Sequence, residues 1–323
     1  MATILVIIDG AESSDYKLCK NINLLKEIGS FRTVNYTPEG METNSLTCIL
    51  NILGVPHNKI PKGRAYLEAI AINEEIDEND LIFRCNNIQV KDDILISCVE
   101  NRKTIIQEED YKDFRLIDIG GYKNLMIIKE GRKHYDSIST FPPHENLGKS
   151  LSGILPKCKD KKVESMLTKL IYKYNLYPWG QSVKEEIPTF YKLYGKKGAV
   201  VCKTEILIGI AKALDMYIPV LNNATAEVDT DLFEKAQKTL ELSKEYDFVL
   251  LHINGADESA HRKNEEEKIN FINKIDKVVI NYLMKNIESN TALIITSDHG
   301  TSSKSGNHIN GDVDYFMCEK YYK

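Results

Sequence analysis

The sequence lacks the features that mark membrane, secreted and nucleic-acid-binding proteins. Its apolar runs fall well short of the roughly twenty residues that a membrane-spanning helix needs. The N-terminal run, Thr3 to Ile8, is also too short for the core of a signal peptide. A formal net charge of −5 leaves no basic surplus to neutralise phosphates, which argues against a general nucleic-acid binder. We therefore expect a soluble, cytoplasmic protein that binds neither membranes nor nucleic acid.

Paired cysteines are missing as well. The seven cysteines are odd in number and scattered, and none forms a Cys-x-x-Cys pair. This pattern is typical of reduced thiols in a cytoplasmic protein and not of a disulfide framework or a zinc knuckle. Internal repeats and low-complexity segments are absent, and a chain of 323 residues is long enough for a sizeable core and two domains.

Three apolar runs of the sequence each lead into an aspartate. These are Asp9 after residues 3–8, Asp257 after residues 248–251, and Asp298 after residues 291–296. In open parallel α/β sheets, ligands bind at the carboxyl ends of the strands. We therefore expect the three aspartates to converge, although they are far apart in sequence.

Histidines accompany two of these aspartates. His299 directly follows Asp298, and His308 comes soon after it. Asp257 and His261 are four residues apart, so they lie on one face of a helix and can bind one ion. An aspartate and a histidine side by side after a buried strand, with another histidine close behind, indicate a metal site.

The order of expected strands and helices predicts an α/β fold, with a mostly parallel sheet and helices on both faces. We expect this core domain over residues 1–60 and 178–323. Its strands are expected at residues 3–8, 31–35, 198–202, 217–221, 248–251 and around 293, and its helices at 14–28, 46–53, up to 214, 231–244 and 264–285. Residues 61–177 contain short strand-like pieces between charged turns, which indicates an inserted, smaller α+β lid over the active edge of the sheet.

Ser45 is a candidate nucleophile because it stands directly before the expected helix at residues 46–53. The start of a helix favours an anion such as phosphate. A metal held by Asp9 and by Asp298 with His299 could remove the proton of the serine by direct coordination. Serine is also a common helix N-cap, so a purely structural role stays open.

The other candidates also have structural alternatives. His308 could be an exposed loop histidine, Asp257 a helix cap, and Asp298 with His299 a turn. Their joint occurrence in this order favours a metal site over any of these separate explanations. His252, at the end of its strand, is expected to pack beside that site without binding a metal.

Taken together, these residues resemble the alkaline phosphatase superfamily, and within it the archaeal-type cofactor-independent (2,3-bisphosphoglycerate-independent) phosphoglycerate mutases. The motifs that carry the resemblance are Ile7-Ile8-Asp9-Gly10, Asn44-Ser45-Leu46-Thr47, Gly255-Ala256-Asp257-Glu258-Ser259-Ala260-His261, Ser297-Asp298-His299-Gly300 and His308. Supporting pieces are Lys62-Gly63-Arg64-Ala65, Phe83-Arg84-Cys85-Asn86 and Trp179-Gly180-Gln181. The similarity covers most of the chain and is most specific at the metal-site positions.

The resemblance implies two divalent metal ions, one bound by Asp257, His261 and His308, the other by Asp9, Ser45, Asp298 and His299. In the family, the serine takes the phosphoryl group as a phosphoserine and passes it to another hydroxyl of the same substrate or to water. Mixed oxygen and nitrogen ligands suit Mn²⁺ or Zn²⁺, and suit Mg²⁺ less well. Arg64 and Arg84 are expected to hold the anionic groups of the substrate, because guanidinium groups bind carboxylate or phosphate bidentately.

Three functions are compatible with this pattern. The chain could be a mutase, an isomerase of glycolysis that interconverts 2- and 3-phosphoglycerate-like phosphoacids. It could instead hydrolyse phosphomonoesters or phosphonates, or be an inactive metal-binding relative. The substrate-binding region departs from the mutase pattern, since it keeps only Arg102 of a basic motif and has Ile208 where a lysine is expected. The intact ligand set favours an enzyme acting on a small phosphorylated acid, and we prefer the mutase; no oligomeric state is assigned.

Overall fold

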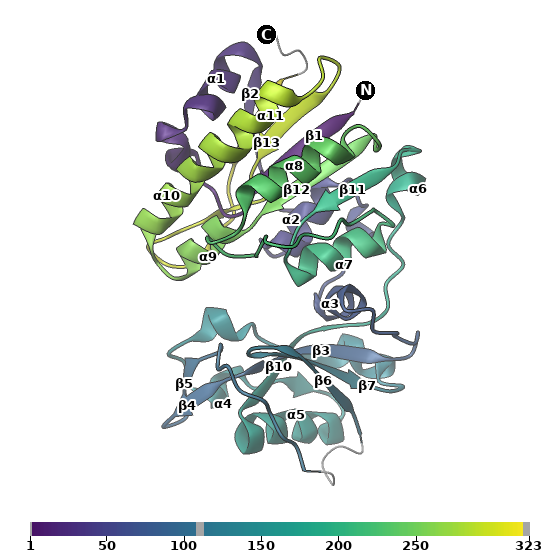
Figure 1. Cartoon of the computed structure of the whole chain (residues 1–323). Coiled ribbons are helices and arrows are strands. Elements are labelled where there is room, and N and C mark those ends of the chain that lie inside the picture. Colours follow the sequence, from purple (N-terminus) through teal and green to yellow (C-terminus); the bar gives the residue numbers. More distant parts are fainter. Residues whose placement is uncertain (1, 108–112, 319–323) are drawn as a thin grey trace. The chain divides into compact units, whose positions relative to one another are not determined.

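The chain folds as two units, residues 1–60 with 187–323 and residues 61–186 (Figure 1). The structure is a computed structural model that describes residues 2–107 and 113–318. The boundary expected at residue 178 falls inside strand β10 (Leu176–Ser182), which pairs with β3 (Leu81–Asn87). Because β3 belongs to the second unit, that unit continues to residue 186.

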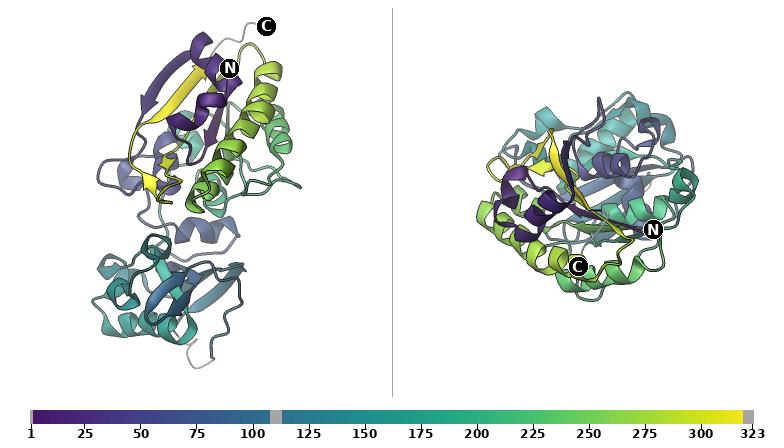
Figure 2. Two further views of the ribbon diagram at one scale, coloured as in Figure 1. Left: turned by 90° about the vertical axis from the view of Figure 1, so that its left-hand side faces the viewer. Right: turned by 90° about the horizontal axis from the view of Figure 1, so that it is seen from above.

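The first unit is built on a six-stranded sheet. In spatial order its strands are β11 (Gly198–Val201), β12 (Phe248–Ile253), β1 (Thr3–Ile8), β13 (Ala292–Thr296), β16 (Val313–Cys318) and β2 (Ser30–Val34). The first four in this order are parallel, whereas β16 is antiparallel to β13. Strand β2 is antiparallel to β16, as the opposed purple and yellow arrows in the left view of Figure 2 show. The predicted mostly parallel sheet is therefore confirmed, with an antiparallel edge.

Three expected elements of this unit differ in the structure. The strand expected at residues 217–221 is wrong, because Tyr217 makes a single bridge to Ala199 and the chain then leaves the sheet. Pro219 lacks the backbone N–H that a continued ladder would use. The helix expected at 264–285 is divided by a π-helical turn at Asp276–Ile280, and the one expected at 14–28 begins as a separate 3-10 turn.

Helices cover both faces of the six-stranded sheet. They are α1 (Lys20–Ile28), α2 (Ser45–Ile52), α6 (Phe190–Tyr194), α7 (Glu205–Ala213), α8 (Leu232–Leu242), α9 (Gly255–His261), α10 (Glu265–Ile275) and α11 (Asn281–Asn286). On one face, Ile4, Val6 and Ile8 of β1 pack in a buried cluster with residues of α1, α8, α10 and α11 (Figure 1). Leu5 and Ile7 point to the opposite face and are also buried. Helix α7, whose buried residues lie outside that cluster, contacts β11 and α2.

The second unit is built on a four-stranded antiparallel sheet in the order β10, β3, β7 (Lys123–Ile128), β6 (Arg115–Gly120). Its other helices and strands are β4 (Gln89–Lys91), β5 (Ile94–Ser97), β8 (Ile138–Ser139), β9 (Lys157–Cys158), α3 (Ala65–Ala71), α4 (Leu151–Ile154) and α5 (Lys161–Tyr174). Helix α5 packs on β10, and its Leu167 and Leu170 join Leu81 and Phe83 in one buried cluster. This unit therefore has a core of its own.

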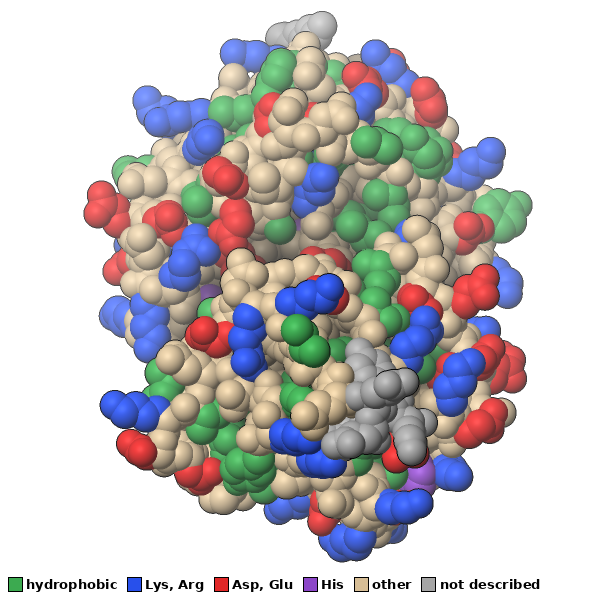
Figure 3. All heavy atoms as spheres, turned by 60° about the horizontal axis from the view of Figure 1, so that its bottom comes forward, with side chains coloured by type: hydrophobic (Ala, Val, Ile, Leu, Met, Phe, Trp, Pro, Cys, Tyr) green, Lys and Arg blue, Asp and Glu red, His purple; other side chains and the backbone are tan. Residues whose placement is uncertain are grey.

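The surface carries charges of both signs. On the face shown in Figure 3, Lys and Arg side chains are interspersed with Asp and Glu side chains. The whole chain contains 42 Lys and Arg residues against 47 Asp and Glu residues, in keeping with this mixture. Within the described residues, every helix is too short or too polar to cross a membrane.

The start of α1 is capped by an acid that is distant in sequence. Cys19, at the N-cap position, offers no side-chain cap. Instead Asp276, buried in the π-helical turn, accepts a hydrogen bond from the backbone N–H of Ile22 at 2.9 Å and another from that of Asn21 at 3.2 Å. These are among the N–H groups that a helix leaves without an internal partner. Asp276 thus fixes α1 to the helices of the same face.

We predict that Asp276→Ala lowers the free energy of unfolding by about 1.5–3 kcal/mol, because buried N–H groups lose a charged acceptor. Urea denaturation followed by circular dichroism measures the change. Asp312→Ala, which alters an exposed aspartate of the same unit, serves as the matched control. Equal stabilities of the two variants would contradict the capping role.

Candidate metal centre

Three aspartates lie at the carboxyl ends of three neighbouring parallel strands. Asp9 follows β1, Asp298 follows β13, and Asp257 lies in α9 directly after β12. Strand β1 stands between the other two in the sheet, and all three aspartates are buried. The arrangement of the sheet therefore brings together carboxylates that are far apart in the chain.

Gly10 permits the close approach of β1 and α9. Its backbone has a φ of +74°, which favours glycine. A Cβ atom at this position would lie 2.8 Å from Cα and 2.9 Å from Oδ1 of Asp257. Any larger residue would therefore displace Asp257 or strain the turn after Asp9.

Asp257, His261 and His308 form one group of ligand atoms. His261 Nε2 lies 3.1 Å from Asp257 Oδ2 and 3.2 Å from His308 Nε2, and His308 Nε2 lies 3.9 Å from Asp257 Oδ1. Helix α9 places Asp257 and His261 one turn apart, as their spacing predicts. His308 arrives on β15 (His308–Ile309), which pairs with β14 (Gly300–Thr301).

The hydrogen bonds of the two imidazoles fix which nitrogens can bind a cation. His261 Nδ1 lies 2.7 Å from the carbonyl oxygen of Gly306, and His308 Nδ1 lies 2.9 Å from that of Thr43. A carbonyl oxygen only accepts, so both Nδ1 atoms carry protons and donate. The Nε2 atoms then turn toward each other and toward Asp257. A proton or a cation must lie among them, since two lone pairs at 3.2 Å repel each other.

Asp9, Ser45, Asp298 and His299 form the second group. Ser45 Oγ lies 3.3 Å from Asp9 Oδ2, to which it donates, and 3.4 Å from His299 Nε2. His299 Nε2 also lies 3.7 Å from Asp9 Oδ1 and 3.5 Å from Asp298 Oδ2. Ligand atoms of His299 also come within 4.8 Å of those of Asp257 and His308, so His299 stands between the two groups.

Asn44, and not Ser45, caps helix α2. The Asn44 side chain accepts a hydrogen bond from the backbone N–H of Thr47 at 3.0 Å. Ser45 is the first residue of the helix, and its hydroxyl faces Asp9 and His299. The structural alternative for Ser45, an N-cap role, is therefore taken by its neighbour.

The buried oxygens of this site fit a cation. Asp9 Oδ1 and both carboxylate oxygens of Asp298 are buried without a hydrogen-bond partner among the described residues. Burial and the charges of Asp298 and Asp257 raise the pKa of Asp9 well above its usual value. Burying these carboxylates without a cation costs free energy. Carboxylate oxygens and imidazole nitrogens of this kind bind divalent cations.

The pKa values of Asp257, His261 and His308, the first group, also fit a cation site. Although burial opposes ionisation, the hydrogen bond and charge of His261 lower the pKa of Asp257 well below its usual value. Burial also opposes protonation of His261, but Asp257 outweighs it and raises the pKa of His261 to about 9. Burial and the charge of His299 lower the pKa of His308 to about 4. The two imidazoles thus share one proton with Asp257, in a place where a metal ion would compete with that proton.

His252 lies beside the second group, as expected. Its Nε2 lies 3.0 Å from Asp9 Oδ2, the oxygen that also accepts from Ser45. Burial and the charge of Lys235 lower the pKa of His252 to about 3, so the ring is neutral. A neutral ring that donates from Nε2 orients Asp9 Oδ2 toward itself and leaves Oδ1 for a cation.

The two arginines predicted to bind substrate meet at a buried acid in the second unit. Arg64 Nε lies 2.7 Å from Glu68 Oε1, and Arg84 Nη1 donates to the same oxygen. Arg84 is only 4% exposed and Arg64 34%. Burial opposes ionisation of Glu68, but the charges of Arg64 and Arg84 lower the pKa of Glu68 to about 2. Sequence reasoning missed Glu68, although its spacing of four from Arg64 on α3 was a usable signal.

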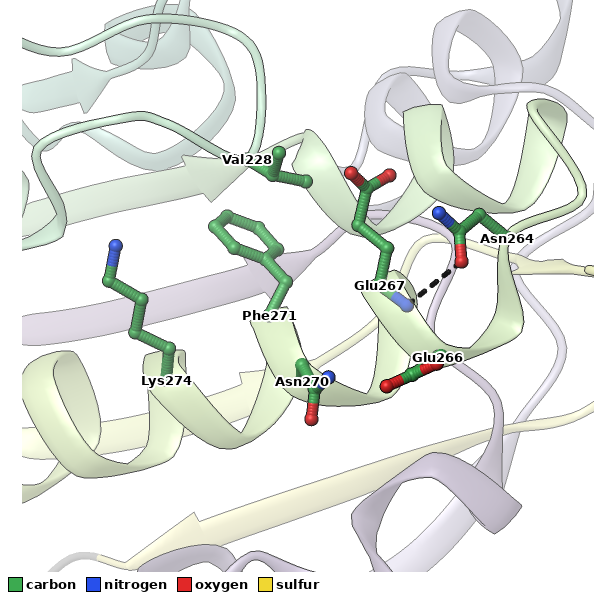
Figure 4. Close-up of a pocket in the computed structure, with 7 residues that line it drawn as sticks. All are labelled: Val228, Asn264, Glu266, Glu267, Asn270, Phe271 and Lys274. Carbon is green, nitrogen blue, oxygen red and sulfur yellow. Dashed lines mark hydrogen bonds between the residues drawn. The ribbon is translucent and has the colours of Figure 1, made fainter.

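A surface hollow of about 420 Å³ lies elsewhere in the first unit (Figure 4). Its lining residues are Val228, Asn264, Glu266, Glu267, Asn270, Phe271 and Lys274. In Figure 4 the Val228 side chain lies next to the Phe271 ring, and Glu267 extends beside them. None of the predicted site residues lines this hollow, so it is separate from the metal centre.

Comparison with known families matches residues 2–323 to the model of the metalloenzyme superfamily. Curated relatives include 2,3-bisphosphoglycerate-independent phosphoglycerate mutases from archaea. The protein of Methanothrix thermoacetophila is 27% identical, and the match covers 92% of this chain and 83% of the relative. That of Pyrococcus abyssi is 29% identical, with 98% of this chain and 88% of the relative covered.

Two solved structures show the same fold. The PH0037 protein from Pyrococcus horikoshii has a TM-score of 0.72 at 21% identity, covering 98% of this chain and 87% of that one. The cofactor-independent phosphoglycerate mutase from Thermoplasma acidophilum has a TM-score of 0.57 at 18% identity, covering 98% of this chain and 90% of that one. Both likenesses extend over nearly the whole chain.

We predict that Asp298→Asn removes one of two bound metal ions. The change keeps the shape of the side chain but removes the charge of a carboxylate whose two oxygens have no hydrogen-bond partner among the described residues. Metal analysis should give about one ion per chain in the variant and about two in the wild type. Asp312→Asn, at an exposed aspartate, should leave the count unchanged. Equal metal content in wild type and Asp298→Asn would contradict the second ligand group.

Proposed function

The chain belongs to the metalloenzyme superfamily, and on that basis we propose that it is a cofactor-independent phosphoglycerate mutase. In this proposal it moves a phosphoryl group between two hydroxyls of one small phosphorylated acid, interconverting 2- and 3-phosphoglycerate. The position of the Ser45 hydroxyl carries the proposal. It lies at the start of a helix, between Asp9 Oδ2 and His299 Nε2, where a phosphate group can approach it.

Ser45 acts as the nucleophile. Its Oγ forms a bond to phosphorus while the ester bond between phosphorus and the substrate oxygen breaks, which gives a phosphoserine and a free hydroxy acid. The other hydroxyl of the bound acid then attacks the phosphoserine, so the phosphoryl group leaves on a different carbon and the Ser45 hydroxyl is restored. No water or second substrate is consumed in this cycle.

The two ligand groups supply the sites for metal ions. Asp257, His261 and His308 would hold one ion, and Asp9, Ser45, Asp298 and His299 the other. Mn²⁺ and Zn²⁺ are the proposed ions, because the ligands combine imidazole nitrogens with carboxylate oxygens. When bound, such ions neutralise charge on the phosphoryl group and favour the ionised serine. Asp9 orients Ser45 Oγ through the hydrogen bond at Oδ2.

The second unit supplies cations for the anionic groups of the substrate. Arg64 and Arg84 bring two positive charges to the single negative charge of Glu68, which leaves a net positive group. Because Arg84 is buried against Glu68, it holds that acid in place. Arg64 is one-third exposed, so part of its guanidinium can contact a carboxylate or phosphate. The centroid of the Trp179 ring lies 6.0 Å from the Arg64 guanidinium, at the limit of a cation–π contact.

We predict that Ser45→Ala lowers kcat by at least about a thousandfold, because the nucleophile is lost. The fold should be retained, since Ser45 is only half-buried and its truncation opens no core cavity. Mass spectrometry of acid-quenched wild type with substrate should show a phosphate on Ser45. Ser243→Ala, at a half-buried serine that ends α8, is the matched control and should keep full activity. Wild-type turnover in Ser45→Ala would exclude Ser45 from the reaction.

We predict that Arg64→Ala lowers kcat/KM by about ten- to a hundredfold, the loss expected for a charge-assisted contact. Metal content should not change, because Arg64 belongs to neither ligand group. Arg115→Ala is the control, since Arg115 is a half-exposed arginine of the same unit that pairs with Glu74. If Arg64→Ala keeps the kcat/KM of the wild type, the substrate anion is held elsewhere. Arg84→Ala is less specific, because it also leaves Glu68 with one buried partner fewer.

A further inference from the structure

The hydroxyl of Thr301 lies between the two ligand groups. Thr301 is fully buried in β14. Its Oγ1 lies 2.5 Å from Asp257 Oδ1, in the first group, and 3.3 Å from His299 Nδ1, in the second. A single side chain therefore touches one ligand of each group without itself belonging to either.

The chemistry of the partners sets the direction of these hydrogen bonds. An ionised carboxylate only accepts, so the one hydroxyl proton of Thr301 goes to Asp257 Oδ1. The hydroxyl oxygen can then only accept from His299, which places a proton on His299 Nδ1. His299 Nε2 is left with its lone pair facing Ser45, Asp9 and Asp298, as a metal ligand requires.

The backbone of Thr301 is held on both sides. Its N–H donates to the carbonyl oxygen of Gly10 at 2.9 Å, directly after Asp9. Its carbonyl oxygen accepts from Lys268 Nζ at 2.8 Å, and Lys268 is buried against Asp15 at 2.9 Å. Thr301 also pairs with His308 across the β14–β15 ladder. These contacts fix the backbone from which the Thr301 hydroxyl reaches Asp257 and His299.

We propose that Thr301 is a positioning residue that couples the two metal sites. The proposal rests on the metal-binding part of the proposed function, not on the identity of the substrate. Thr301 fixes the carboxylate of Asp257 for one ion and the tautomer of His299 for the other. An ion bound at one group therefore stiffens the hydroxyl that orients the other group. Loss of the hydroxyl weakens both sites, whereas loss of a ligand such as Asp298 weakens one.

The test is calorimetric titration of the metal-free protein with Mn²⁺ and, separately, Zn²⁺, for the wild type, Thr301→Val and Thr301→Ser. With either metal, we expect Thr301→Val to lower the affinity of both ligand groups by about ten- to a hundredfold. Loss of a hydrogen bond to a metal ligand has an effect of this size elsewhere. Thr301→Ser keeps the hydroxyl and should restore both affinities to within about threefold of the wild type. This rescue separates hydrogen bonding from a general effect on packing.

Thr239→Val is the matched control, because Thr239 is an equally buried threonine whose hydroxyl donates to the Lys235 carbonyl in α8. It should bind both ions as the wild type does. Circular dichroism checks the fold of each variant, and Thr301→Ala replaces Thr301→Val if the valine variant does not fold.

The outcomes separate this inference from the proposed function. Unchanged affinities in Thr301→Val, or weakening of one ion alone, would overturn the coupling role while leaving the mutase assignment intact. Weakening of both ions with serine rescue supports the coupling role even if the wild type fails to isomerise phosphoglycerate, a failure that would count against the substrate alone. A wild type that binds fewer than two ions would overturn both.

Discussion

Crowded negative charge at the end of three parallel strands is the constraint on which the rest of this structure depends. Asp9, Asp257 and Asp298 are buried within one cluster, and burial together with its acidic neighbours raises the pKa of Asp9. Unpaired carboxylates in such a place cost several kcal/mol each unless cations or protons accompany them. His261 and His308 donate from Nδ1 to backbone carbonyl oxygens, so their Nε2 atoms face the same cluster. Metal binding is therefore the arrangement in which all these groups are satisfied together.

The proposed function depends on where the Ser45 hydroxyl lies relative to that charge. Ser45 begins a helix that Asn44 already caps, so its hydroxyl is available to the cluster. The arginines of the second unit are organised around Glu68, which keeps one cation buried and leaves the other partly exposed. The candidate metal ligands and these arginines thus belong to separate units of one chain, each with its own core.

Much of the centre could be predicted from the sequence because its residues follow apolar runs. Asp9, Asp257 and Asp298 each end or follow a strand, and the spacing of Asp257 and His261 is that of a helix turn. The antiparallel edge of the sheet could not be predicted, because β2 and β16 lie near opposite ends of the sequence. The direction in which two strands pair also leaves no local sequence pattern. Asp276 and Thr301 act through tertiary contacts, and a lone Asp or Thr carries no signal of its partner. For Glu68 the spacing of four from Arg64 was a local signal, but its contact with Arg84 was not. At residues 217–221 the local sequence was informative. Pro219 has no backbone N–H for a strand ladder, so this apolar run does not form a strand.

The central claim is that Ser45 returns the phosphoryl group to the same acid. It is tested most directly by ³¹P NMR of 3-phosphoglycerate incubated with the purified, metal-loaded chain and quenched with a chelator. The account predicts a 2-phosphoglycerate signal that grows while inorganic phosphate stays at the level of a blank, and no conversion when the chelator is added first. Release of inorganic phosphate without 2-phosphoglycerate would contradict the mutase and identify a phosphate-ester hydrolase instead.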